Sequence, residues 1–276
     1  MSKYGIMLPI SLNGYHSDVE LLTDIENNKI DSIWVRDLPV AQFLDRDEGS
    51  CLDPFLFVNE LSSTFDKKFI LGIAVINTSF RTPENTIREI LSTLELKEKS
   101  KFIFGIGDGA KNAVFELLGI NYDEKRILFE KWLDRYVAYY QNQVSGLSSV
   151  ESRTYIKWFK DIKIPKLTVS TRNMDLLQKY ADIIERNIIW YSQPTIISDI
   201  KTSFPDIELN MFLRIKLVSK NNTLKFDDKS RTIVVSPDKL RRLSEEYSTL
   251  GVERLILSLE NPKVSSSLLN RRSEEH

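Results

Sequence analysis

The chain has 276 residues, a length typical of one closed β/α barrel. Its 38 lysines and arginines nearly balance 39 aspartates and glutamates, so no overall field attracts nucleic acid or an anionic membrane surface. No apolar run reaches the ~18 residues of a membrane span, and a single cysteine, Cys51, excludes an internal disulfide framework. The first residues are too briefly apolar for a signal peptide, and these features together predict a cytoplasmic location.

Short apolar runs, rich in β-branched and aromatic residues, alternate with segments of helical period along the chain. The predicted strands cover residues 4–10, 32–36, 69–76, 102–106, 166–169, 188–191, 209–218, 232–235 and 252–259. The predicted helices cover residues 18–28, 54–64, 83–96, 123–143, 173–181 and 237–250, and another begins near residue 110. Three of them start with a capping residue before a proline: Asp53-Pro54, Thr82-Pro83 and Ser236-Pro237.

The alternation of strands and helices predicts βαβ units, which close either a doubly wound sheet or a barrel. Roughly eight units in about 260 residues favour the (β/α)8 barrel. One strand is then surplus, and we expect segment 209–218 or 232–235 to lie outside the barrel. The polar segment 219–230 is predicted to be a loop, and the whole chain, 1–276, to be one domain ending in a tail over 263–276.

In such a barrel the loops that follow the strands carry the chemistry. This rule selects residues 13–16, 36–37, 77–81, 107–111, 170–173, 190–191 and Glu260. The run Gly105–Gly109 suits either an anion near a helix amino end or a plain tight turn. With two histidines and one cysteine in the chain, the sequence offers no metal-ligand cluster, and His16 and Cys51 have simpler interpretations as a solvated and an inert side chain.

Three further groups at strand ends have a functional and a structural interpretation. Residues 170–173 (Ser-Thr-Arg-Asn) suit a phosphate-binding helix start, or an ordinary N-cap with a solvated arginine. Arg36-Asp37 is either catalytic or a structural ion pair at the barrel rim. Trp190-Tyr191 either stacks on a flat ring or packs at the rim.

Several segments in this order resemble the luciferase-like monooxygenase superfamily of bacterial luciferase-type flavin oxidoreductases. They are SIWVRD followed by LDPFLFVNELSSTF, then FILGIAVINTSFRTPENTIREILSTLE, then FIFGIGDGAKNAVFELLGINYDEKRILFEKWLDRY. The resemblance extends over nearly the whole chain and is strongest over residues 31–140. It implies a luciferase-like (β/α)8 barrel that binds FMN at its carboxyl mouth.

The resemblance also implies roles for particular residues. Ala74-Val75 matches a non-proline cis peptide beneath the isoalloxazine ring, and Arg36 matches the position of the catalytic histidine of luciferase. Gly107 and Asp108 match the loop that meets the flavin and its phosphate. The second phosphate loop corresponds to Ser170, Thr171, Arg172 and Asn173, and the aromatic positions beside the flavin correspond to Trp190 and Tyr191.

By the same resemblance, the protein is an FMN-dependent monooxygenase or oxidoreductase of a small organic substrate, with Arg36 and Asn77 as catalytic residues. A separate flavin reductase and a homodimer are the implied partners. Two alternatives remain open: a non-catalytic flavin- or ligand-binding barrel, either a degenerate homologue or a partner subunit, and a deazaflavin-dependent hydride-transfer enzyme.

The sequence departs from the family pattern at several loops. Glu98–Lys101, Glu185–Asn187 and Val235–Pro237 replace motifs that usually contain glycine, in agreement with only 10 glycines in the chain. Asp108 places a carboxylate where luciferase has an arginine for the phosphate, which favours weakened or lost cofactor binding. Lys111, Arg172 and Lys101 are the candidates to offset this charge.

Overall fold

The computed structural model describes residues 3–8, 30–38, 53–64, 69–96, 101–109, 112–117, 119–141, 164–219, 223–227 and 231–259. The expectations for the helix over 18–28, for His16, Cys51, Lys111 and Glu260, and for the tail over 263–276 lie outside these ranges.

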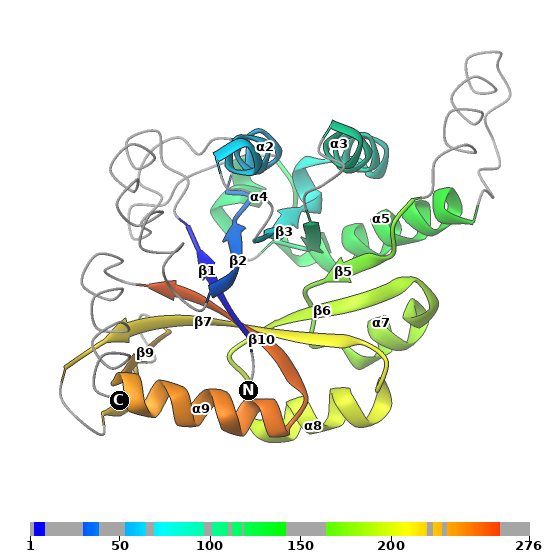
Figure 1. Cartoon of the computed structure of the whole chain (residues 1–276). Coiled ribbons are helices and arrows are strands. Elements are labelled where there is room, and N and C mark those ends of the chain that lie inside the picture. The colour runs from blue at the N-terminus through cyan, green and yellow to red at the C-terminus, as the bar shows by residue number, and fades with distance from the viewer. Residues whose placement is uncertain are drawn as a thin grey trace, which may run out of the picture.

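Eight parallel strands form a closed barrel (Figure 1). In chain order they are β1 (Lys3–Met7), β2 (Ile30–Val35), β3 (Ile70–Asn77), β4 (Lys101–Gly107), β5 (Leu167–Val169), β6 (Ile184–Trp190), β7 (Glu208–Leu217) and β10 (Val252–Leu259). Each strand pairs with the next, and β10 pairs with both β1 and β7, which closes the ring. The predicted (β/α)8 barrel is therefore confirmed.

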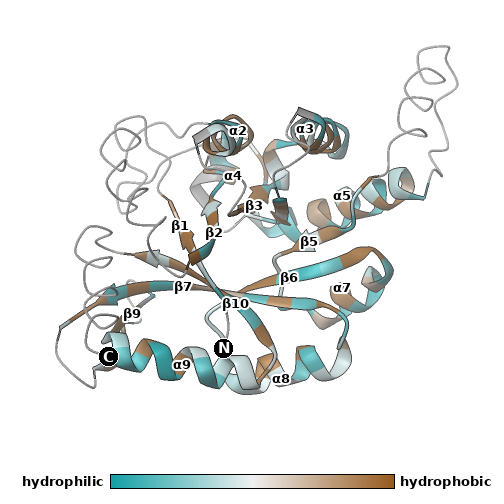
Figure 2. Cartoon of the chain, in the orientation of Figure 1, coloured by the Kyte–Doolittle hydropathy of each residue, from teal (hydrophilic) through white to brown (hydrophobic). Residues whose placement is uncertain are grey.

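Helices cover the outside of this barrel (Figure 1). They are α2 (Pro54–Thr64), α3 (Pro83–Leu96), α4 (Asn112–Leu117), α5 (Lys125–Tyr140), α7 (Met174–Lys179), α8 (Pro194–Ser203) and α9 (Pro237–Thr249), with short 3-10 turns η1 (Thr78–Phe80), η2 (Tyr122–Glu124) and η3 (Ala181–Ile183). Figure 2 shows mainly hydrophobic residues on β1 and β2, and a mixture of both kinds on α9. The larger apolar cluster joins the strands to α2, α3, α5, α7, α8 and α9. Within the described ranges, no helix is both long and apolar enough to cross a bilayer.

Two short strands lie outside the barrel, in the connection between β7 and α9. Strand β9 (Thr232–Val235) pairs with the last residues of β7, beyond the point where β6 ends, and β8 (Leu224–Asp227) pairs antiparallel with β9. Segment 232–235 is thus the surplus strand expected from the sequence. The predicted loop over 219–230 is wrong at β8, because the side chains of this strand are exposed and carry no burial pattern.

Two other differences from the predicted elements have simple causes. Helix α8 is absent from the predicted helices because Gln193, at its N-cap, is not one of the residue types that mark a helix start. Strand β6 starts four residues before the predicted segment 188–191, because polar side chains of its first half face the amino end of the barrel, where they are paired.

The middle of the barrel interior is apolar and is filled around Trp34. A second apolar cluster contains Met7, Trp34, Ile103, Ile188, Phe212 and Ile256, one from each of six strands. Trp34 fits because its neighbours on β1 and β3 are glycines: a Cβ at Gly5 would lie 2.5 Å from the indole nitrogen, and one at Gly72 would overlap the ring. The indole N–H donates to Ser32 Oγ at 2.9 Å.

The amino end of the barrel is closed by a polar layer. The side chain of Arg254 is only 3% exposed and binds Asp31 at 2.8 Å and Glu208 at 3.3 Å. Arg186 donates to the same Glu208 at 2.9 Å. These ion pairs connect β2, β6, β7 and β10 across the amino end of the barrel.

We predict that Gly72→Ala destabilises the protein by about 1–3 kcal/mol, because the new methyl group overpacks the interior against Trp34. Urea unfolding of Gly72→Ala, Trp34→Phe and the double variant measures this. The double variant should be more stable than the sum of the single effects predicts, by about 1 kcal/mol or more. Additive effects would contradict the assigned contact.

Candidate functional site

Inward-facing side chains at the carboxyl ends of the strands line the mouth of the barrel. Because strand residues two apart share a face, Arg36 follows Trp34, Trp190 follows Ile188, Arg214 follows Phe212 and Ser258 follows Ile256 into this mouth. The mouth thus combines two guanidinium groups, one hydroxyl and an indole above an apolar layer.

Strand β3 bulges into the mouth at Ala74-Val75. The peptide bond between these residues is cis, as predicted, and the pairing of β3 with β4 shifts register between Ile73 and Ile76. The Val75 side chain covers two glycines of β4: a Cβ at Gly107 would lie 2.7 Å from Val75 Cγ2, and one at Gly105 would lie 3.2 Å from Val75 Cγ1. Val75 therefore presents an apolar surface at the mouth that side chains in place of these glycines would displace.

Arg36 and Asp37 do not form the ion pair that their adjacency suggested. The Asp37 side chain is 5% exposed and accepts from Arg81 Nε at 3.0 Å. The amide of Asn77 donates to the same carboxylate oxygen at 3.1 Å. The structural interpretation therefore holds for Asp37, with Arg81 as its partner, while Arg36 remains a residue of the mouth.

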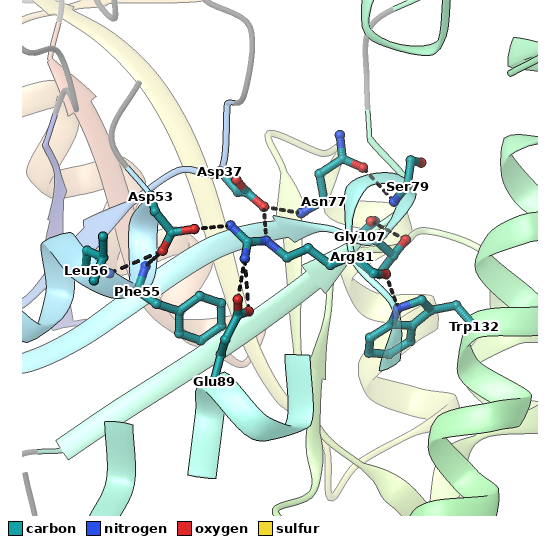
Figure 3. A network of polar contacts seen from close by, with 11 residues as sticks. Asp37, Asp53, Phe55, Leu56, Asn77, Ser79, Arg81, Glu89, Gly107 and Trp132 are labelled. Atoms are coloured by element: carbon teal, nitrogen blue, oxygen red, sulfur yellow. Dashed lines mark hydrogen bonds and ion pairs between the residues drawn. The ribbon is translucent and has the colours of Figure 1, made fainter. Parts of the chain in front are cut away.

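Arg81 is the centre of a network of three carboxylates (Figure 3). Besides Asp37, its guanidinium binds Asp53 at 2.5 Å and Glu89 at 2.9 Å. Its carbonyl oxygen accepts from the Trp132 indole of α5 at 2.9 Å. Asp53 also caps α2 as predicted, since Oδ1 accepts from the Phe55 amide at 2.9 Å. The network joins the end of β2, the start of α2, the β3–α3 loop and α3.

One cation does not fully compensate three partly buried acids. Burial raises the pKa of Asp37 against the opposing effect of Arg81, and it raises the pKa of Glu89 in the same way. Burial alone would lower the pKa of Arg81, but Asp37 and Asp53 raise it overall. The carboxyl groups of Asp37 and Glu89 therefore hold protons more tightly than in water.

Asn77 is buried and holds the β3 loop against the β4 loop. Its Oδ1 accepts from the Ser79 amide at 3.1 Å and caps η1. Its amide group lies beside Gly109, because a Cβ added to that glycine would be only 2.9 Å from Asn77 Nδ2. The φ of Gly109 is +77°, which also favours glycine there. Thr78 Oγ1 donates to the Gly107 carbonyl at 3.0 Å, which joins the two loops a second time.

The charge of Asp108 is offset by Lys125 of α5, a residue that no local sequence motif marks. Lys125 Nζ lies 3.6 Å from the Asp108 carboxylate and also donates to the Gly109 carbonyl at 3.3 Å. Burial nevertheless raises the pKa of Asp108. Lys101 was wrong as a candidate partner, because it begins β4 at the opposite end of the barrel. The contacts of Arg172 are with backbone carbonyls of β6.

The predicted second phosphate loop is occupied by bonds within the chain. Asn173 caps α7 and accepts from Asp175 and Leu176 amides at 3.0 and 3.2 Å, so the N-cap interpretation is confirmed. Thr171 Oγ1 accepts from the Asn173 amide at 3.0 Å. The Ser170 side chain lies beside Gly107: a Cβ added to this glycine would be 3.7 Å from the Cβ of Ser170.

Arg172 is more than a solvated arginine. Its Nη2 donates to the carbonyl oxygens of Trp190 at 3.1 Å and of Tyr191 at 2.7 Å, across the end of β6. The two aromatic residues are 38% and 37% exposed. Trp190 packs on Phe212 with ring centres 4.4 Å apart, and Tyr191 stacks on Phe226 of β8 at 5.3 Å. Trp190 and Tyr191 therefore pack at the rim and still leave part of their ring surfaces exposed.

The lining of the mouth suits the flat ring system of a flavin-type cofactor better than it suits the cofactor's phosphate group. Val75 and Trp190 offer apolar surface, and Arg36, Ser170 and Arg214 offer polar groups around it. At the expected phosphate position, the side chains of Thr171 and Asn173 already bond within the chain, and a carboxylate lies on the neighbouring loop. No cluster of metal-binding side chains occurs in the part of the chain that the structure describes.

Solved structures share this fold, whereas no family model and no curated protein matches the sequence. An F420-dependent secondary alcohol dehydrogenase in complex with an F420–acetone adduct matches with a TM-score of 0.72 and 8% identity, over 97% of this chain and 96% of that one. A monooxygenase of Streptomyces bottropensis matches with 0.69 and 12% identity, over 97% and 96%. The oxygenating constituent of the Pseudomonas putida 3,6-diketocamphane monooxygenase, in complex with FMN, matches with 0.66 and 11%, over 99% and 97%. The chain therefore shares the barrel fold of these three proteins.

We predict that Arg81→Met destabilises the protein by about 3 kcal/mol near neutral pH, since it leaves buried carboxylates without their cation. This is the low end of the usual range because Asp53 and Glu89 are 35% and 33% exposed. Chemical denaturation of wild type and variant gives the difference. Arg126→Met, which removes only the exposed Arg126–Glu130 pair, is the control and should cost less than about 0.5 kcal/mol.

The loss of unfolding free energy caused by Arg81→Met should depend on pH. A carboxyl whose pKa is raised by folding contributes stability below its unfolded pKa, and that contribution is lost as pH rises through the folded pKa. Without Arg81, the pKa values of Asp37 and Glu89 should rise further. The deficit should therefore be largest at about pH 7–8 and shrink towards about pH 4–5. A deficit that grows on acidification would contradict this account.

Proposed function

We propose that this protein is a divergent luciferase-like oxidoreductase that binds FMN, or a deazaflavin in its place, at the carboxyl mouth of the barrel and acts on a small organic substrate. The observation that carries the proposal is the β3 bulge, which sets Val75 over Gly105 and Gly107. It is supported by the shared fold of proteins solved with FMN and with F420. When bound, the cofactor supplies the redox chemistry.

The chain's own residues would bind and orient the reactants. Ala74, Val75 and Gly107 would support the flat ring, with Trp190 and Tyr191 at its edge. Near the phosphate tail of the cofactor, the Ser170 side chain lies beside Gly107, and Lys111 belongs to the proposal as a candidate to offset the charge of Asp108.

The remaining residues near the phosphate tail of the cofactor either carry a charge or bond to the backbone at the start of α7. Asp108 lies on the loop with its charge offset by Lys125. Thr171 and Asn173 would contribute through backbone groups, because their side-chain oxygens are engaged. Arg172 would hold the end of β6 in place.

Of the two proposed catalytic residues, Arg36 would act at the reactive face and Asn77 would position the loops beside it. Arg36 would stabilise negative charge that develops there, since a guanidinium does not transfer its proton in proteins. Asn77 would shape the loop after β3 through its bond to the Ser79 amide, and it would hold this loop beside Gly109 in the loop after β4. A flavin reductase as electron donor and a homodimer are further parts of the proposal.

A second candidate function is a binding barrel without catalysis. It is favoured by the phosphate end of the site, where Asn173 and Thr171 are satisfied internally and Asp108 carries a negative charge. The two functions differ in turnover. A binding barrel would retain the cofactor but show no oxygen consumption or hydride transfer with any reduced donor.

The full chain should bind FMN or F420 with micromolar affinity or tighter, which quenching of cofactor fluorescence measures. Failure to bind either cofactor would remove the proposed function. Tight binding without reductase-dependent oxygen uptake or substrate-dependent oxidation of reduced F420 would favour the binding barrel.

Gly107→Ala should lower the affinity for the bound cofactor about tenfold, or about 1.4 kcal/mol, because its methyl group would lie 2.7 Å from Val75 Cγ2 and displace that side chain. The double variant Gly107→Ala/Val75→Ala has room for the methyl group, so it should regain thermal stability without regaining affinity. Wild-type affinity in a stably folded Gly107→Ala protein would contradict the position assigned to the ring.

A further inference from the structure

The β8–β9 hairpin places an arginine beside the mouth. Arg231 immediately precedes β9 and has a φ of +52°, in the left-handed region that favours glycine or asparagine. Strand β9 pairs with the end of β7, so the hairpin lies beside β7 just past the last pairing of β6. An arginine therefore occupies a turn position where its backbone conformation is unfavourable.

Aromatic contacts bring this hairpin to the end of β6. Phe226 of β8 stacks on Tyr191 with ring centres 5.3 Å apart. The carbonyl oxygen of Tyr191 accepts from Arg172 Nη2 at 2.7 Å. Arg172, Tyr191 and Phe226 thus form one continuous corner of the rim, and the exposed fraction of Phe226 is 40%.

The two arginines of this corner affect each other. Burial lowers the pKa of Arg172, and the charge of Arg231 lowers it further. In the portion of the chain with described coordinates, neither arginine has an acidic partner within ion-pair distance. The bond from Arg172 to Tyr191 and the stacking of Tyr191 on Phe226 bring the β8–β9 hairpin, with Arg231 before β9, to the side of Arg172. Two like charges therefore lie at one corner of half-exposed aromatic rings, and an anion bound there would relieve their repulsion.

We propose that Arg172 and Arg231 bind the carboxylate of the substrate, whose flat apolar body lies against Trp190, Tyr191 and Phe226. The substrate class is thus an aromatic or otherwise apolar organic acid, and this assignment rests on the proposed function. Guanidinium groups match carboxylates through paired N–H donors, and aromatic rings bind a flat apolar body.

The cofactor phosphate is the other anion that could occupy the site, and the geometry favours the substrate. Arg172 reaches over the end of β6, towards the hairpin, through its bonds to Trp190 and Tyr191. The phosphate is expected on the other side of residue 172, between the loops of β4 and β5, where Asp108 lies.

The experiment uses 2-naphthoate and 2-naphthylmethanol, which share a ring system and differ in charge. Titration calorimetry or quenching of tryptophan fluorescence in the full chain should show at least tenfold tighter binding of naphthoate. Arg231→Gln should remove most of this difference and leave naphthylmethanol unchanged. Arg172→Gln should act in the same direction. Arg242→Gln, an exposed arginine on α9, is the matched control and should keep the wild-type preference.

A second pair of ligands, FMN and riboflavin, tests the origin of the anion. The ratio of their affinities should be the same in wild type and Arg231→Gln. If Arg231→Gln instead lowers the affinity for FMN alone and leaves naphthoate unchanged, the arginines bind the cofactor phosphate and the proposal is overturned. Equal wild-type affinity for naphthoate and naphthylmethanol overturns it as well. Absence of FMN and F420 binding is a separate result, which removes the proposed function while the naphthoate preference is still measured.

Discussion

The ion pairs of Arg81 fix the shape of the mouth. Loops after barrel strands have no sheet hydrogen bonds to hold them, and here a single guanidinium joins Asp37 after β2, Asp53 before α2 and Glu89 on α3. Because Asp37 also accepts from the Asn77 amide, the ends of β2 and β3 are held at a set separation. Arg36 and Val75, which lie at the mouth, take their positions from these same strand ends.

This network is better understood as a positioning device than as a source of stability. Removing three carboxylates and one guanidinium from water has a large desolvation cost, which the ion pairs recover only in part. The raised pKa values of Asp37 and Glu89 are the sign of incomplete recovery. Trp34 and its two glycine neighbours do the opposite: they fill the interior with apolar contacts and contribute stability.

The sequence predicts features that depend on local pattern and misses those that depend on how distant elements meet. The barrel, the cap at Asp53 and the surplus strand at 232–235 follow from periodicity and turn chemistry. The sequence allows an ion pair at Arg36-Asp37, but it does not identify Arg81, more than forty residues further along the chain, as the partner of Asp37. Lys125 was missed because its position beside Asp108 depends on the packing of α5, sixteen residues beyond Gly109.

The charges of the mouth divide it into two sides. On the side of β4 and β5, Asp108 is balanced by Lys125 and the capping oxygens are already bonded, so a phosphate on that side would depend on backbone amide groups. On the side of β6 and the hairpin, Arg172 and Arg231 carry like charges beside exposed rings. A neutral flat ring would be held at Val75, between the two sides, and an organic acid at the arginines. Since Arg36 follows Trp34 into the same mouth, a cofactor and an acidic substrate so placed would meet beside its fixed positive charge.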